Sequence, residues 1–304
     1  MTIVVETFAD TDYEAPPVAP GRWNRAVVSR IAGVLLCSVA IALSCFLAEV
    51  TVLGRFEQNH DQQLEYDNLR NELANGIAPI SAYDYLGVQL QLGAPVALLN
   101  IPEIGLNEVV AEGTTAGVLE AGPGHQRNTV MPGQVGTSII MGREATYGGP
   151  FRYINQLQAG DTFTVTTGQG VATYRVLDVR RAGDQYPPAA SAKEGRLTMI
   201  TAAGAAFMPD DEVRVDSTLI SPAQPSPGGP VIALNSDEAA LSGESTSGTL
   251  IFFWGELLVA ATAGAFWARS RWGRLQTWLV GAPVLGVLGL TLADQIARLL
   301  PNLL

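Results

Sequence analysis

Three long apolar runs stand out against a background of shorter, alternating ones. The first covers 31–53 with Glu49 as its single charge, and the other two cover 249–268 and 277–296. A helix of about 20 apolar residues crosses the ~30 Å hydrocarbon core of a bilayer. The pattern therefore predicts three transmembrane helices. The first run is too long for the apolar core of a cleaved signal peptide, which favours an uncleaved anchor.

Arginines flank these runs on one predicted side of the membrane. Three of them, Arg22, Arg25 and Arg30, precede the first run, and the loop 269–276 between the last two runs carries more. Positive residues are retained in the cytoplasm. We therefore expect a plasma-membrane, multi-pass protein with an internal N-terminus. The predicted cytoplasmic parts are 1–30 and 269–276, and the predicted extracytoplasmic parts are 54–248 and 297–304.

The external region divides into three parts by pattern. Residues 54–94 begin with a polar, helix-forming stretch that Gly76 ends, which predicts a largely helical stalk. Residues 95–220 contain seven short apolar or alternating runs separated by Gly and Pro, which is typical of an all-β barrel or sandwich. Residues 221–248 are rich in Pro, Gly and Ser and predict a flexible linker.

Two local motifs refine the β region. The run TFTVTT is followed by GQG and then by VATYRVLDV, which predicts a hairpin. The segment PFRYINQL between two strands predicts a single short helix.

Charge and composition exclude several functions. Lys and Arg total 18 against 29 Asp and Glu, so the formal charge is −11, which disfavours binding to nucleic acid phosphates. Cys37 and Cys45, the only cysteines, lie about 12 Å apart along one predicted helix and cannot bridge each other there. The histidines are His60 and His125. No cluster has the spacing of a metal site, and we expect neither metal nor cofactor.

The external region resembles the sortases, membrane-anchored cysteine transpeptidases of Gram-positive bacteria, and in particular the actinobacterial class E group. The resemblance covers 97–220. It rests on NIPEIGLNEVVAEGTT, AGPGHQRNTVMPGQVGTSIIMG, TYGGPFRYINQLQAGDTFTVTT, TYRVLDV and LTMIT, in that order. It implies an eight-stranded sortase-type β-barrel with short helices, carried by an N-terminal transmembrane helix and a C-terminal transmembrane hairpin.

The resemblance also implies three catalytic positions, and each holds a different residue here. Active sortases use a cysteine thiolate as nucleophile, a histidine as acid or base, and an arginine that steadies the substrate or the oxyanion. The cysteine position holds Ala202, the histidine position Arg143, and the arginine position Glu212. A shift of two residues would place Arg214 in the last position instead.

Other polar residues near these positions are candidate groove contacts. Thr201 adjoins the vacant cysteine position, but its hydroxyl would need a positioned base. The imidazole near the predicted barrel is His125, for which a structural role is favoured. Arg143 and Glu212 carry complementary charges, which predicts an ion pair across the former cleft. The remaining candidate contacts are Glu144 and Arg214.

These observations favour a catalytically inactive, sortase-like membrane protein. We expect its barrel and helices to bind or position another cell-envelope protein. Two alternatives remain open: a transpeptidase with a non-cysteine nucleophile such as Thr201, and a receptor that binds sorting-type peptides without cleaving them.

Overall fold

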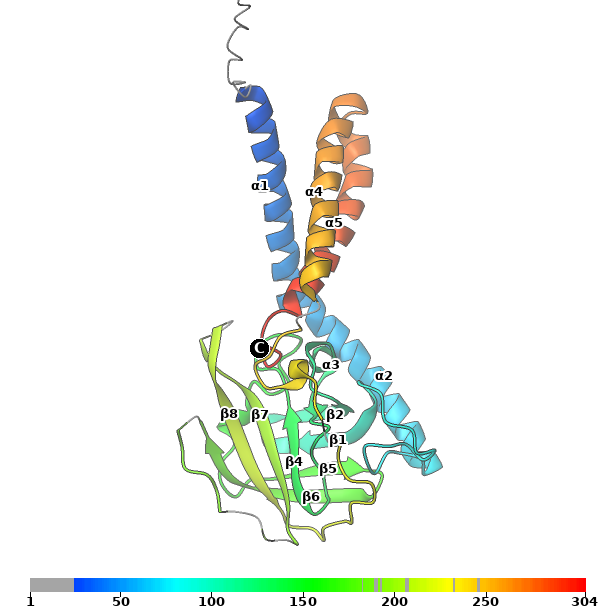
Figure 1. The fold of residues 1–304 in the computed structure, drawn as a ribbon, viewed down its shortest axis with the longest axis vertical. Coiled ribbons are helices and arrows are strands. Elements are labelled where there is room, and N and C mark those ends of the chain that lie inside the picture. Colours follow the sequence, from blue (N-terminus) through cyan, green and yellow to red (C-terminus); the bar gives the residue numbers. More distant parts are fainter. Residues whose placement is uncertain are drawn as a thin grey trace, which may run out of the picture.

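A bundle of three long helices extends from one end of a closed β-barrel (Figure 1). The computed structural model describes residues 25–181, 183–188, 191, 193–205, 208–231, 233–244 and 247–304. Most of the predicted cytoplasmic tail, including Arg22, lies outside these described residues.

The barrel confirms the predicted fold class. Its strand order around the wall is β1-β2-β3-β4-β7-β8-β6-β5. Neighbouring strands are antiparallel except for the β2–β3 and β4–β7 pairs, which are parallel. The strands are β1 (Pro95–Ile101), β2 (Leu106–Glu112), β3 (Gly124–His125), β4 (Gly136–Met141), β5 (Thr162–Thr167), β6 (Gly170–Arg180), β7 (Gly195–Ala205) and β8 (Met208–Leu219).

Alternating side chains fill the barrel and explain these strands. Along β5 the buried and exposed positions alternate, so every second side chain points inward. The inward rings of Phe163 and Tyr174 stack with their centroids 5.5 Å apart. The Tyr174 hydroxyl accepts a hydrogen bond from the Gly133 amide at 2.6 Å, which satisfies the polar end of a buried ring.

The local predictions of the β region hold with two differences. Thr167 pairs with Gly170, which confirms the hairpin between β5 and β6. The predicted short helix is a single 3-10 turn, η3 (Ile154–Gln156). The eighth strand is β3, which has two residues and no apolar run, so hydrophobic patterning did not reveal it.

Among the residues that the structure describes, three helices are long and apolar enough to cross a membrane. They are α1 (Arg25–Ala48), α4 (Ser247–Arg271) and α5 (Arg274–Ala297). A 24-residue helix is about 36 Å long, which matches the bilayer core. Large apolar side chains such as Leu36 and Phe252 are more than two-thirds exposed in the protein, as expected for lipid-facing positions.

Helix α1 continues into the predicted stalk. A π-helical segment, η1 (Glu49–Leu53), joins α1 to α2 (Gly54–Asn75), and Figure 1 shows the helix axis changing direction there. Gly76 ends α2 in the left-handed conformation with φ of 67°, as the sequence predicted. Residues 77–94 form turns and extended chain instead of more helix.

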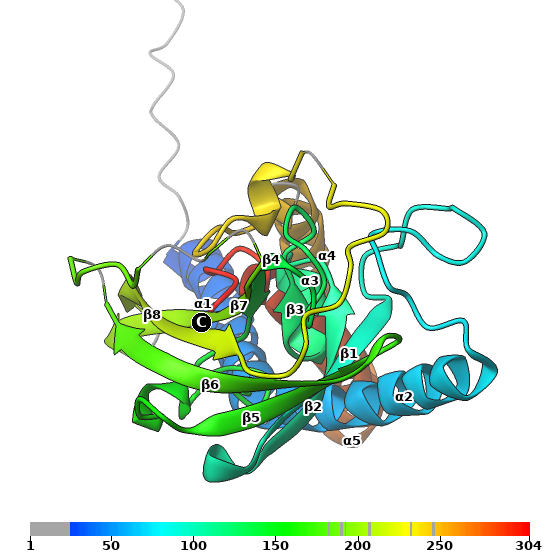
Figure 2. The ribbon, with the colours of Figure 1, turned by 90° about the horizontal axis from the view of Figure 1, so that it is seen from below.

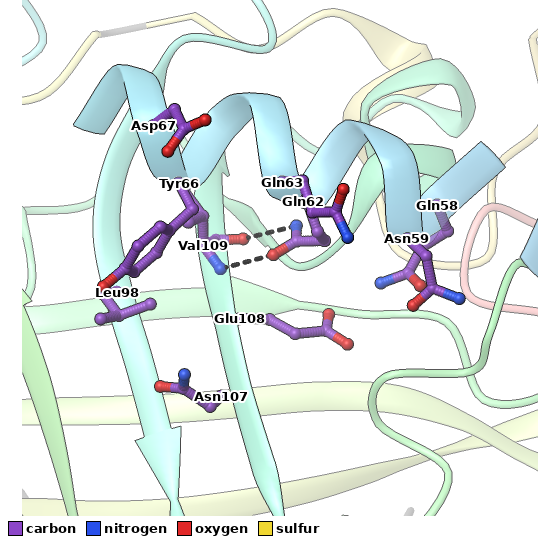
Figure 3. A pocket seen from close by; sticks show the side chains of 10 residues that line it. All are labelled: Gln58, Asn59, Gln62, Gln63, Tyr66, Asp67, Leu98, Asn107, Glu108 and Val109. Atoms are coloured by element: carbon purple, nitrogen blue, oxygen red, sulfur yellow. Dashed lines mark hydrogen bonds between the residues drawn. The ribbon is translucent and has the colours of Figure 1, made fainter. Parts of the chain in front are cut away.

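Helix α2 lies along the outer wall of the barrel beside β1 and β2 (Figures 1 and 2). Gln62 joins the two: its side chain accepts from the Val109 amide at 2.7 Å and donates to the Val109 carbonyl at 3.1 Å (Figure 3). The same amide group donates to the Ala121 carbonyl at 3.0 Å. Around Gln62 lies an amide-rich hollow of about 530 Å³.

The segment predicted as a flexible linker, 221–248, contacts the barrel along most of its described part. Gln224 exchanges backbone hydrogen bonds with the loop before β4, and a 3-10 turn, η4 (Ser236–Glu238), follows. Glu238 is fully buried and paired with Arg127. The segment was predicted to be flexible from its Pro, Gly and Ser content, and such a composition gives no information about individual polar contacts.

Replacing Gln62 by Ala should loosen α2 from the barrel. The change leaves the Val109 amide and carbonyl without their partner, which costs about 1–3 kcal/mol for a buried polar group. Thermal unfolding of the purified protein, together with proteolysis of α2, measures the effect. The neighbouring exposed residue gives the control: Gln63→Ala should leave both unchanged. Equal behaviour of the two variants would contradict the role of Gln62.

Candidate functional site

The three positions that the sequence singles out lie at the same end of the barrel. Ala202 on β7 is directly opposite Glu212 on β8. β4 runs parallel to β7, with Met141 opposite Ile200, and the chain continues from β4 to Arg143. The strand register therefore brings all three positions together.

Arg143 is the central charged group of this region and is 1% exposed. Its guanidinium donates to the carbonyls of Leu119 and Ala116, at 3.1 and 2.9 Å, and to the Thr146 hydroxyl at 3.0 Å. The two carbonyls belong to the short helix α3 (Ala116–Ala121). The last carbonyls of a helix lack partners within it, and Leu119 is one of these, so a cation suits this end of α3.

Glu120 supplies the countercharge and joins Arg143 to the end of the α4–α5 hairpin. One carboxylate oxygen lies 3.6 Å from Arg143 and the other lies 3.2 Å from Arg298, just after α5. Burial raises the pKa of Glu120 to about 7, against the lowering effect of the two guanidinium groups.

The predicted ion pair between Arg143 and Glu212 does not form. Glu212 instead accepts from Arg214 at 2.6 Å, and both side chains are partly exposed. Residues two apart on a strand share a face, so Arg214 reaches Glu212 directly. Arg143 is directed away from β8 because α3 offers it two carbonyls and Glu120 within reach.

The remaining candidate residues do not form a nucleophile–base pair. Thr201 is 2% exposed, and its hydroxyl donates to the Gly142 carbonyl at 2.8 Å. His125 is buried on β3, where its Nδ1 lies 2.8 Å from Glu112 and its Nε2 lies 3.0 Å from the Val130 carbonyl. Glu144 donates its backbone amide to the Leu303 carbonyl at 2.9 Å.

A segment that sequence reasoning missed, Pro301–Leu304, fills the space beside Ala202. Leu303 is fully buried in an apolar cluster with Leu119, Met141, Ile200 and Ala202. Figures 1 and 2 both show the C-terminal end, marked C, beside β7. The signal was present in the sequence as two leucines beyond the last membrane run, which are costly to leave exposed to water.

Two hollows remain at this end of the barrel. One, of about 150 Å³, adjoins Ala202 and is lined by Glu144, Arg152 and Arg181 among others. A larger one, of about 520 Å³, lies between the end of β6 and the start of β8, with Tyr186 at its wall. Within the described residues, no group of three or more His, Cys, Asp or Glu is placed to hold a metal ion.

Comparison with known proteins matches this barrel to one family. Residues 99–211, from β1 into β8, match the sortase domain family. A solved transpeptidase, Sortase D5 of Clostridium perfringens, is 31% identical, with 44% of this chain and 83% of that chain covered and a TM-score of 0.39. Residues 99–211 thus form a domain of the sortase family.

Two curated sortases are also similar to this chain. Sortase SrtE1 of Streptomyces coelicolor is 27% identical over 160 residues, which cover 50% of this chain and 44% of that protein. Sortase D of Bacillus subtilis is 29% identical over 90 residues, which cover 30% of this chain and 44% of that protein. The matched part is thus less than half the length of either relative.

Removing the Arg143 side chain should destabilise this sortase domain strongly. Arg143→Ala leaves buried Glu120 with Arg298 as its remaining cation and leaves two carbonyls of α3 without their donor, and breaking a buried ion pair in this way costs about 3–5 kcal/mol. Arg214→Ala, which breaks a partly exposed pair, should cost less than about 1 kcal/mol. Unfolding by denaturant compares the two.

A double-mutant cycle assigns the partner of Arg143. Combining Arg143→Ala with Glu120→Gln should give a coupling energy above about 0.5 kcal/mol, whereas combining it with Glu212→Gln should give additive effects. Coupling to Glu212 in place of Glu120 would overturn the described arrangement.

Proposed function

We propose that this sortase-family protein is anchored in the plasma membrane, does not carry out thiol transpeptidation, and positions another protein of the cell envelope. One observation carries the proposal: the chain has no cysteine beyond Cys45, so the barrel offers no thiolate to form an acyl intermediate. Both cysteines lie in α1. The family resemblance assigns the nucleophile position to Ala202, whose methyl group supplies no chemistry.

The geometry gives little support to a substitute nucleophile. The Thr201 hydroxyl already donates its proton to a backbone carbonyl. Attack on a peptide would require a base within hydrogen-bond reach, and both nitrogens of His125 are held by other groups. The Arg143 guanidinium accepts no proton at neutral pH and cannot replace a histidine as base.

The helical bundle supports an orientation with the barrel outside the cell. Arg25 and Arg30 begin α1, and Arg269, Arg271 and Arg274 surround the turn between α4 and α5. In Figure 1 the start of α1 and the turn between α4 and α5 lie at the end of the bundle that is far from the barrel. Retention of arginine in the cytoplasm then leaves the barrel on the extracytoplasmic side.

Cysteine labelling in intact cells tests this orientation. In a chain with Cys37→Ser and Cys45→Ser, Asn75→Cys at the exposed end of α2 should react with a membrane-impermeant maleimide added outside. Ser270→Cys, in the last turn of α4, should react only after the cells are permeabilised. The reverse pattern would refute the proposed topology.

The open part of the former cleft is the contact surface we assign to the partner. Tyr186 is largely exposed there and lies over the Arg180 guanidinium, 4.5 Å from it. Tyrosine is among the residue types that dominate protein interfaces. Glu212 and Arg214 line the same hollow and add charges of both signs for a polar rim.

Exposure of the purified protein to a sorting-type peptide separates the candidate functions. We expect neither cleavage nor a covalent peptide adduct by mass spectrometry, and no saturable peptide binding. Cleavage would establish an active enzyme, and saturable binding without cleavage would establish a receptor.

A matched pair of variants tests the scaffold. Affinity purification in mild detergent should recover a cell-envelope protein in fixed ratio, and Tyr186→Ala should reduce the recovered amount by about tenfold, the loss expected from an interface anchor worth about 1.4 kcal/mol. Tyr153→Ala, at an exposed tyrosine outside this hollow, should leave recovery unchanged. Equal recovery with both variants would contradict the assignment of this hollow as the partner's contact surface.

A further inference from the structure

The space between α3, the segment Gly142–Thr146 and β7 has the features of a peptide-binding groove. It has an apolar pocket and backbone amides that donate hydrogen bonds to the last residues of the same chain. It also has two backbone carbonyls that accept hydrogen bonds from one side-chain amide. We propose that this groove binds an extended peptide with an asparagine followed by leucine, and that the chain's own Pro301–Leu304 occupies it in cis. This inference goes beyond the proposed function and holds whether or not the barrel has a protein partner.

The pocket for Leu303 is the apolar part of the groove. Its walls are Leu119 from α3, Met141 from β4, and Ile200 and Ala202 from β7. Without Leu303 these side chains would line an empty apolar hollow, because Leu303 itself is fully buried among them.

Asn302 supplies the polar recognition. Its side-chain amide donates to the carbonyls of Thr114 and Ala239, at 2.8 and 2.9 Å, and its backbone amide donates to the Ser242 carbonyl at 2.8 Å. Because these acceptors come from the barrel and from the segment after η4, both are needed to complete the groove. An aspartate would present two acceptors to two carbonyls and would be rejected.

Backbone contacts fix the segment along its length. The amides of Glu144 and Thr146 donate to the carbonyls of Leu303 and Leu304, at 2.9 and 3.1 Å. The Thr146 hydroxyl also donates to the Leu304 carbonyl at 2.6 Å while it accepts from Arg143. Arg143 is therefore a positioning residue that acts on the segment through Thr146.

A single reporter thiol tests the occupancy. In the full chain with Cys37→Ser and Cys45→Ser, Ala202→Cys should react slowly with a maleimide, because the site is 4% exposed and covered by Leu303. Deleting residues 301–304 should accelerate the reaction by about tenfold or more, since reaction then needs no local opening. A synthetic Leu-Leu-Pro-Asn-Leu-Leu peptide should restore slow reaction in the deletion variant, and the same peptide with Asp in place of Asn should not.

Point variants keep the test decisive if the deletion prevents folding. In the same reporter chain Asn302→Ala and Leu303→Ala should each accelerate labelling, whereas Leu299→Ala, at a partly exposed position outside the groove, should not. Rapid labelling of the unmodified reporter chain would show an open groove and overturn the proposal. So would a folded deletion variant that the peptide fails to protect.

Discussion

The buried guanidinium of Arg143 is the constraint on which the rest of this end of the barrel depends. A charge removed from water must find hydrogen-bond acceptors and a countercharge, or the protein does not fold around it. Here the acceptors are two carbonyls of α3 and the Thr146 hydroxyl, and the countercharge is Glu120. Helix α3 and the segment after β4 are consequently held against each other at this end of the barrel.

The parts of this fold that the sequence predicted are those governed by regular hydrophobic periods. The apolar runs became α1, α4 and α5, and the alternating run TFTVTT became β5, because burial on one face sets the period of a strand. Strand β3 has two residues and is defined by its neighbours, so no period marks it. The docking of 221–244 depends on single pairs such as Arg127–Glu238, which leave no pattern along the chain.

At the candidate site, too, the positions were predictable from the sequence but the individual contacts were not. Patterning and resemblance identified Ala202 and Glu212, and the register places them opposite each other. The partner of Arg143 was predicted wrongly because a charge on one strand can be satisfied by any element that packs near it. Glu120 lies on a short helix between β2 and β3, where neither hydrophobic period nor family motif signals a role. Leu303 was interpreted as part of an external tail, although its apolar side chain requires cover.

Arg143 is connected to the helical bundle on two sides, at the start of α2 and at the end of α5. On one side, Tyr147 lies under the Arg143 guanidinium, 4.8 Å from it, and presses against the start of α2: a Cβ added to Gly54 would lie 2.8 Å from the tyrosine ring. On the other side, Glu120 links Arg143 to Arg298 at the end of α5. Close packing transmits displacement, since packed groups cannot move independently. The position of the bundle relative to the barrel is therefore fixed by the same residues that hold Arg143.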